Sequence, residues 1–356
     1  MAALASLRRE SFQRNNEYQK VGTRSQDKKG YSVCKITEIT KGVQVVSEEG
    51  STIHEDSFLR TIGHTISRRN FLARTTGAVG AVAIAKNLAA ASGMFVAAYH
   101  GATAAYHQQQ FDASDGLLKK GYRIRSLSVY RTSGSTLYAA VWTTEGGPAW
   151  QAFHGLSGDA YQKYFDQWRA KGYRPVIITA TGGGVVGLND TNVPVFAGVF
   201  QKDAAPFTAR HNIDSGTFNG LCQWAKQNHH VLRWASIYGG RDRLYAGIWE
   251  KVPPNVIWDY KITIAIDGPE QGVPLTMPGQ PSLRLAFVTR SPFAEYLAVY
   301  RSDQTGDWKE RHGMTSNEYQ QQHDALKAVG YFPMCVQAGG DPRVAPPHFV
   351  AMFEKL

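Results

Sequence analysis

Three histidines recur at one position of a repeated sequence pattern, and they are the candidate binding residues of this chain. Each follows an aromatic residue by four positions, in the pairs Trp150 and His154, Phe207 and His211, and Trp308 and His312. A row of such side chains on one face could bind a glycan or a peptide by stacking and hydrogen bonding. The simpler interpretation, which we favour, is that each imidazole bonds the backbone at a helix entry, because residues shared by repeats usually serve the common fold.

Common catalytic motifs do not occur from residue 94 onward. This region contains no Gly-x-Ser-x-Gly turn and no His-Glu-x-x-His pair, and "TGGGVVG" at 181–187 lacks the Lys-Ser/Thr ending of a phosphate-binding loop. Ser-x-x-Lys occurs only at 25–28 and 32–35. We therefore expect no catalytic residue, no cofactor and no metal; Asn189–Asn192 could bind calcium, but four polar residues between strands are usually a turn.

Two of the three cysteines, Cys222 and Cys335, lie in this same region. Cys222 falls in the apolar stripe of a predicted helix and Cys335 in a predicted strand, which favours buried free thiols. A disulfide between them after export is the alternative. Their spacing has no zinc signature.

The histidines open units whose copies are clearest at residues 154–175 and 312–333. Ser157 and Thr315 are residue types that cap helix N-termini, and Thr315 with Glu318 forms a capping box. An apolar stripe follows at helical spacing, and a glycine ends each helix. The stripes and stops are Tyr161, Phe165, Trp168 and Gly172 in one copy, and Tyr319, Leu326 and Gly330 in the other.

A third, degenerate copy begins at His211. Asp214 takes the cap position, and Phe218 and Cys222 take the stripe. His229 stands where the stop glycine would be.

A second signature, a short strand-like run, reveals about five units. The runs are "YAAVW" at 138–142, "FAGVF" at 196–200, "YAGIW" at 245–249, "YLAVY" at 296–300 and "FVAMF" at 349–353, about fifty residues apart. Another β-rich run precedes each, as in "PVIITA" and "VLRWASIY". We predict an α+β tandem repeat whose unit is a helix and a two-stranded β element, stacked as a propeller-like ring or a short solenoid. The helix pattern is missing from the fourth unit, between Trp258 and Ser282.

The segments "HGLSGDAYQKYFDQWRAKGYRP" and "YAAVW" resemble the bacterial tandem repeat domain, which also forms the non-catalytic N-terminal domain of fungal polyglycine hydrolases. The resemblance covers about residues 100–356. In those hydrolases a separate C-terminal β-lactamase-like domain with a Ser-x-x-Lys nucleophile cleaves the peptide, and we expect no such domain after Leu356. The resemblance thus implies a propeller-like module without catalytic residues.

The stretch "SRRNFLARTTGAVGAVAIAKNLAAASG" resembles a twin-arginine export signal, with Arg68 and Arg69 before Phe71 and Leu72, a short apolar segment and small residues near 89–91. The apolar segment is too short for a stable membrane span. We divide the chain into an extension, 1–66, a signal peptide, 67–93, and a repeat domain, 94–356. A start codon assigned too far upstream would explain the extension. The expected location is periplasmic or extracellular.

Positive charge concentrates in the leader. Residues 1–93 carry 14 Lys and Arg against 8 Asp and Glu, and the remainder carries 25 against 21, so nucleic-acid binding loses its main support. The expected partners are the twin-arginine export machinery and an extracellular peptide or glycan. We predict a non-catalytic binding module; a secreted serine hydrolase or peptidase, or its detached accessory domain, is the alternative.

Overall fold

The computed structural model describes residues 93–132, 135–183, 193–240, 242–264, 273–291, 295–339 and 346–356, together with the backbone of Ala85–Leu88. The predicted export motif at Arg68, Arg69, Phe71 and Leu72 lies outside these residues, as do the extension and the loop Asn189–Asn192. In the described part of the chain, no helix is both long enough and apolar enough to cross a membrane.

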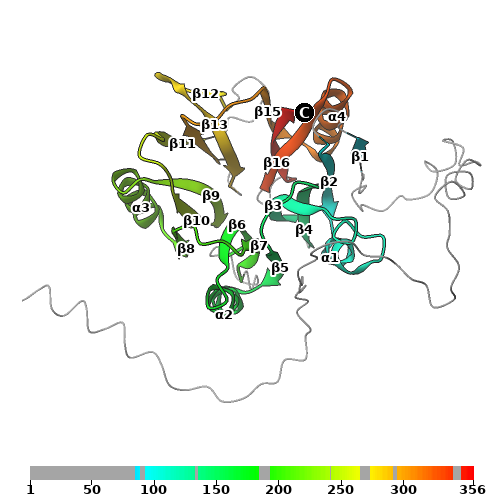
Figure 1. Ribbon diagram of the computed structural model, residues 1–356, viewed down its shortest axis with the longest axis horizontal. Coiled ribbons are helices and arrows are strands. Elements are labelled where there is room, and N and C mark those ends of the chain that lie inside the picture. The colour runs from blue at the N-terminus through cyan, green and yellow to red at the C-terminus, as the bar shows by residue number, and fades with distance from the viewer. Residues whose placement is uncertain are drawn as a thin grey trace, which may run out of the picture. The chain divides into compact units, whose positions relative to one another are not determined.

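Small antiparallel sheets and short helices repeat along the described chain (Figure 1). The strands are β1 (Ala85–Leu88), β2 (Phe95–Ala102), β3 (Arg123–Thr132), β4 (Ser135–Thr143), β5 (Trp150–Leu156), β6 (Arg174–Thr181), β7 (Val195–Gln201), β8 (Phe207–Ile213), β9 (His230–Gly239), β10 (Arg243–Lys251), β11 (Trp258–Ile264), β12 (Thr276–Met277), β13 (Gln280–Arg290), β14 (Glu295–Arg301), β15 (Trp308–Met314), β16 (Tyr331–Gly339) and β17 (His348–Lys355). The helices are α1 (Ala104–Asp112), α2 (Gly158–Arg169), α3 (Ser215–Gln227) and α4 (Ser316–Ala328). The sheets have the strand orders β1-β2-β4-β3, β5-β7-β6, β8-β10-β9, β11-β14-β13-β12 and β15-β17-β16.

The five strand-like runs of the sequence form β4, β7, β10, β14 and β17, which have a strand on either side in their sheets. The β-rich runs before them form β3, β6, β9, β13 and β16, so both predictions are confirmed. These central strands are almost wholly buried. Gly198 in β7 has no room for a side chain, because an added Cβ would lie 2.4 Å from the carbonyl oxygen of Ile177 and 2.9 Å from the Phe153 ring.

The predicted two-stranded unit is wrong, because a third strand precedes the helix. The residues that begin at Trp150, Phe207 and Trp308 and lead to each helix are the strands β5, β8 and β15. Each of these strands contains a β-bulge, which interrupts the alternation of apolar and polar residues typical of a strand. The residue after each histidine, Gly155, Asn212 or Gly313, has a positive φ, and the register with the central strand shifts there. The usual unit is therefore strand, helix, strand, strand, and the fold is mostly β.

The helix predictions are confirmed at their caps. Ser157 and Asp214 accept hydrogen bonds from backbone N–H groups three residues on, and Thr315 with Glu318 makes the complete capping box. His229 replaces the stop glycine in a left-handed conformation, with φ of 54°. The stripe of α2 differs in one residue, since Tyr164 is buried and Phe165 only partly so.

The first unit has a helix, α1, that the sequence patterns did not reveal. Its inward side carries His107 and Gln110 beside Phe111, so it lacks an apolar stripe. In the fourth unit, by contrast, the predicted loss of the helix is confirmed for the described residues 258–264 and 273–291, which form strands and turns.

One strand of each sheet contacts the next unit: β3 touches β6, β6 touches β9, β9 touches β13, β13 touches β16, and β16 touches β3 again. Side-chain hydroxyls join several of these strands. Ser126 Oγ accepts from Val336 N at 3.0 Å, Thr179 Oγ1 accepts from Val129 N at 3.2 Å, and Ser236 Oγ accepts from Ala180 N at 3.0 Å. The contacts therefore form a cycle, in which the fifth unit meets the first.

Strand β1 lies within the predicted signal peptide. It pairs antiparallel with β2 at the edge of the first sheet. Without β1, that sheet would have three strands in the order β2-β4-β3, as the second, third and fifth sheets do.

Candidate functional site

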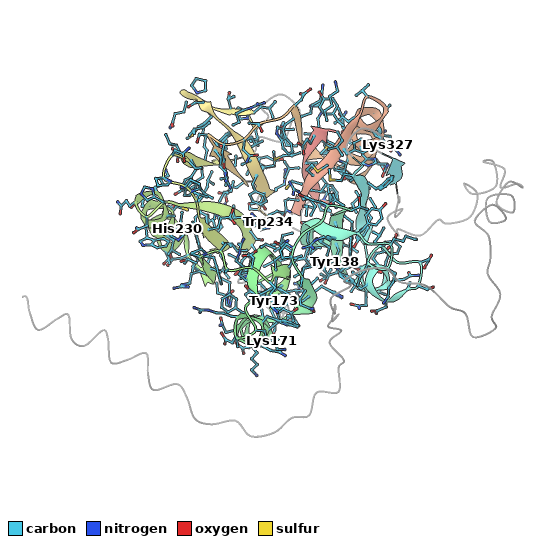
Figure 2. All side chains as sticks on the ribbon, viewed as in Figure 1. Tyr138, Lys171, Tyr173, His230, Trp234 and Lys327 are labelled. Carbon is cyan, nitrogen blue, oxygen red and sulfur yellow. The ribbon has the colours of Figure 1, made fainter. Side chains whose placement is uncertain are left out.

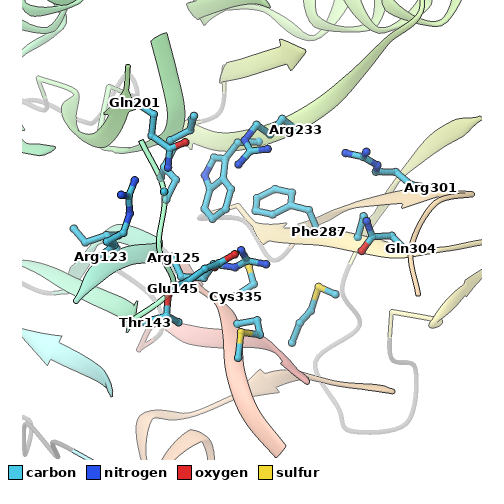
Figure 3. A pocket seen from close by; sticks show the side chains of 18 of the residues that line it. Arg123, Arg125, Thr143, Glu145, Gln201, Arg233, Phe287, Arg301, Gln304 and Cys335 are labelled. Atoms are coloured by element: carbon cyan, nitrogen blue, oxygen red, sulfur yellow. The ribbon is translucent and has the colours of Figure 1, made fainter. Parts of the chain in front are cut away.

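All five units contribute side chains to one cavity of about 430 Å³. It opens where the first residues of β3 and the neighbouring parts of β6, β9, β13 and β16 approach one another (Figure 3). Trp234 lies among these strands, whereas Lys171 and Lys327 lie near the ends of α2 and α4 (Figure 2). The cavity therefore exists only when the units are assembled.

Arginines dominate the charged lining of the cavity. Arg123 and Arg125 come from β3, Arg233 from β9 and Arg301 from the end of β14 (Figure 3). Glu145, after β4, is the carboxylate among the described lining residues, and it pairs with Arg125 at 2.9 Å. The lining thus has more guanidinium groups than carboxylates.

Glu250 at the end of β10 supports three of the surrounding arginines. Its carboxylate lies 3.1 Å from Arg233, 3.4 Å from Arg174 and 3.8 Å from Arg301. Arg174 also pairs with Asp203, and Arg301 makes two hydrogen bonds to Asp303 at 2.8 and 2.6 Å. Glu250 is therefore the main counterion of Arg233, because Arg174 and Arg301 each have a carboxylate of their own.

Arg123 has no carboxylate within ion-pair distance in the described chain. Its guanidinium lies 5.9 Å from the centre of the Trp150 ring, and an added Cβ on Gly147 would approach it to 3.0 Å. Its Nη2 is buried without a hydrogen-bond partner among the described residues. Burial lowers the pKa of Arg123 and the charge of Glu145 partly offsets this, but an arginine remains charged at neutral pH.

The inner wall of the cavity is apolar. Trp234 and Phe287 pack with ring centroids 4.5 Å apart, and both are more than nine-tenths buried. Cys335 is a free thiol whose Sγ lies 3.8 Å from Val288 O, and burial raises its pKa to about 12. Cys335 is therefore a protonated thiol at neutral pH, and the predicted buried free thiols are confirmed for it and for Cys222.

The residues predicted from the sequence as a binding row do not gather at one place. Trp308 lines the cavity, and Trp150 is buried beneath Arg123. His154, His211 and His312 lie in β5, β8 and β15 and are absent from the described lining. His211 instead borders a groove of about 560 Å³ between α2 and β8.

Each of these histidines packs against an aromatic ring of the preceding unit. The His154 ring lies 5.4 Å from Tyr138, the His211 ring 4.9 Å from Tyr161, and the His312 ring 5.8 Å from Tyr296. His154 Nε2 also lies 2.7 Å from Gln108 Oε1. Burial lowers the pKa of His154 and of His211, so both imidazoles are neutral at pH 7.

His100 occupies the same position where the fifth unit meets the first, and the sequence patterns did not single it out. Its ring lies 4.9 Å from Tyr319 and 5.3 Å from Phe349, and its Nε2 lies 2.9 Å from Ser316 Oγ. The signal was available as "HGAT", which matches the His-Gly and cap positions of "HGLS".

The described residues contain no group of three histidine, cysteine or acidic side chains placed to hold a metal ion. Comparison with protein-family models adds a finding on the repeats. The polyglycine hydrolase-like structural repeat matches four times, at residues 96–145, 147–203, 204–252 and 305–356, together more than half of the chain. The unmatched interval, 253–304, contains the fourth unit, which has no described helix.

Proposed function

Because the chain belongs to the family of polyglycine hydrolase-like structural repeats, we propose that it is an exported, non-catalytic binding module. The observation that carries the proposal is the cavity, since all five units line it and its size is typical of small-ligand sites, about 300–1,000 Å³. The ligand is an extracellular peptide or glycan.

The cycle of contacts among the five units supports a propeller-like ring rather than an open solenoid. In a solenoid the first and last units would be far apart, whereas here Ser126 and Ser128 bond the backbone of β16. A closed ring also leaves fewer unpaired strand edges. The ring would hold the cavity in shape by fixing its walls to one another.

The binding role is testable by filling the cavity. Ala286 lines it and is partly exposed, so Ala286→Trp should occupy the space, while Ala170→Trp at the exposed end of α2 adds the same side chain elsewhere. We expect the tagged full-length chain and Ala170→Trp to bind components of peptide and glycan arrays, and Ala286→Trp to lose that binding. Equal binding by all three proteins would contradict the cavity as the site.

Export is proposed from the twin-arginine motif alone. Arg68→Lys with Arg69→Lys keeps the positive charge but removes the guanidinium pair, so the double variant should accumulate in the cytoplasm. Cell fractionation measures this. Normal secretion of the double variant would refute the export route.

An accessory role beside a hydrolase is the second candidate, and the name of the matching family favours it. Under this hypothesis the module would bind the substrate that a separate enzyme cleaves. Adding the full-length chain to such an enzyme should then increase cleavage of bound substrate, and Ala286→Trp should not.

A further inference from the structure

The cavity contains more positive charge than its own carboxylates neutralise. Arg125 is paired with Glu145, and Arg301 donates hydrogen bonds to both carboxylate oxygens of Asp303. Arg233 shares Glu250 with Arg174 and Arg301, and Arg123 has no ion pair among the described residues. Arg233 donates to both oxygens of Glu250 through Nη1, at 3.1 and 3.2 Å. Arg123 is therefore the cation best able to accept an anionic ligand, and Arg233 is a second donor whose Nη1 alone is used by Glu250.

Both arginines also have hydrogen-bond donors that are not used. Arg123 Nη2 and Arg233 Nε are buried without a partner among the described residues. An unsatisfied buried donor is costly, and a ligand oxygen that reaches these guanidinium groups would remove that cost. The side chain of Arg233 is 37 % exposed, which leaves it room to adjust toward a ligand.

A planar, two-oxygen anion suits this arrangement. Guanidinium groups bind carboxylates through paired hydrogen bonds, and charge-assisted bonds of this kind are about twice as strong as neutral ones. Gln201 and Gln304 also line the cavity and can both donate to and accept from peptide groups. The apolar wall of Trp234, Phe287 and Cys335 can contact an aliphatic side chain.

A sugar fits the same cavity less well. Sugars bind best to an aromatic ring whose face is open, but Trp234 is 8 % exposed and Phe287 4 %. Trp308 is only partly exposed, and its Nε1 already donates to Thr305 O. The chemistry of the lining therefore favours a peptide over a glycan.

We propose that the cavity binds the C-terminal carboxylate of a peptide chain, held by Arg123 and Arg233. This inference rests on the proposed binding function and specifies its ligand. The terminal carboxylate lies against the two guanidinium groups, the last peptide groups bond Gln201 and Gln304, and the last side chain packs on the apolar wall.

The test uses two peptide libraries that differ by one charge. N-acetylated tripeptides of randomised sequence are prepared with a free C-terminal carboxylate or with a C-terminal amide, and binding to the full-length chain is measured by affinity selection and calorimetry. Arg123→Gln tests the binding residue whose loss breaks no ion pair. Arg169→Gln on the exposed side of α2 is the control with the same charge change.

We expect the free-acid library to bind and the amide library to bind at least about tenfold more weakly, since hydrogen bonds to charged groups are the strong ones. Arg123→Gln should weaken acid binding by a similar factor, and Arg169→Gln should not. Equal binding of acid and amide would overturn this inference while leaving the binding module intact. Binding of oligogalacturonate without binding of either peptide library would also overturn this inference and leave the binding module intact. If neither peptide library nor oligogalacturonate binds, both proposals are refuted.

Discussion

Acidification should destabilise the contact between the first and fifth units through His100. The ring is 3 % exposed, packs on Tyr319 and Phe349, and bonds Ser316. Burial lowers the pKa of His100 from 6.5 to about 4, against a smaller opposing effect of the hydrogen bond. The folded protein therefore holds His100 neutral at a pH where the unfolded chain binds a proton.

The sign and size of the effect follow from proton linkage. The folded pKa is below the unfolded one, so the contribution is complete above about pH 6.5 and is lost as pH falls toward 4. At about 1.4 kcal/mol per pKa unit, the whole shift corresponds to about 3 kcal/mol, of which about 2 kcal/mol is lost by pH 5. Burial lowers the pKa of His107, His154, His211 and His323 too, so they act in the same direction.

The contribution of His100 can be separated by a variant that cannot titrate. His100→Gln keeps a side chain able to bond Ser316 but has no proton to gain between pH 7 and pH 5. Urea unfolding at a series of pH values gives the free energy of unfolding of each protein. We expect His100→Gln to be less stable at pH 7, and to lose about 2 kcal/mol less than the wild type between pH 7 and pH 5.

Carboxylates that titrate in the same pH range do not disturb the comparison of the two proteins. Burial raises the pKa of Glu310, which opposes the histidine effect, but Glu310 is present in both proteins and its contribution cancels in the comparison. An identical loss of stability in the wild type and in His100→Gln would refute the assignment of the acid sensitivity to this contact.

Three other perturbations address the repeats. Joint replacement of His154, His211 and His312 by Ala should lower the free energy of unfolding by about 1 kcal/mol per site; unchanged stability with lost peptide or glycan retention would instead make them the binding row. Gly198→Ala should lower the free energy of unfolding, measured in urea, by more than about 2 kcal/mol, because the added methyl group clashes with β6. Gly220→Ala, with open space around it in α3, should raise that free energy by about 0.5–1 kcal/mol. Similar effects of the two variants would contradict the packing described. Deletion of residues 311–356 removes β16, the strand of the fifth unit that contacts β3, so the remnant should aggregate. A soluble remnant with a sharp thermal transition would contradict the closed arrangement.

Features whose signals are local can be predicted from the amino-acid sequence. The caps at Ser157, Asp214 and Thr315 depend on atoms three residues away, and the central strands appear as short apolar runs at a regular interval. The regular interval of these runs also predicts the number of units, and the fourth unit is recognised by its missing helix pattern. These features need no information about distant parts of the chain.

Local signals failed where the backbone departs from regular geometry. The strands β5, β8 and β15 contain a bulge at the residue after the histidine, so their alternation breaks and they resemble loops. Helix α1 shows no apolar stripe in the sequence, because the polar residues His107 and Gln110 occupy its inward side. In both cases the residue types are those of another kind of element.

The closing contact and the cavity depend on residues that are far apart in the sequence and meet only in the folded chain. Ser126 and Val336 are bonded although they are 210 residues apart, and His100 and Ser316 are 216 residues apart. Arg123 and Arg233 belong to different units. Arg123 follows a recurring Gly-Tyr pair, as Arg174 does, but this pattern does not show that Arg123 and Arg233 line the same cavity. They line one cavity because the cycle of contacts brings together the strands β3, β6, β9, β13 and β16. No sequence pattern within a single unit contains that arrangement.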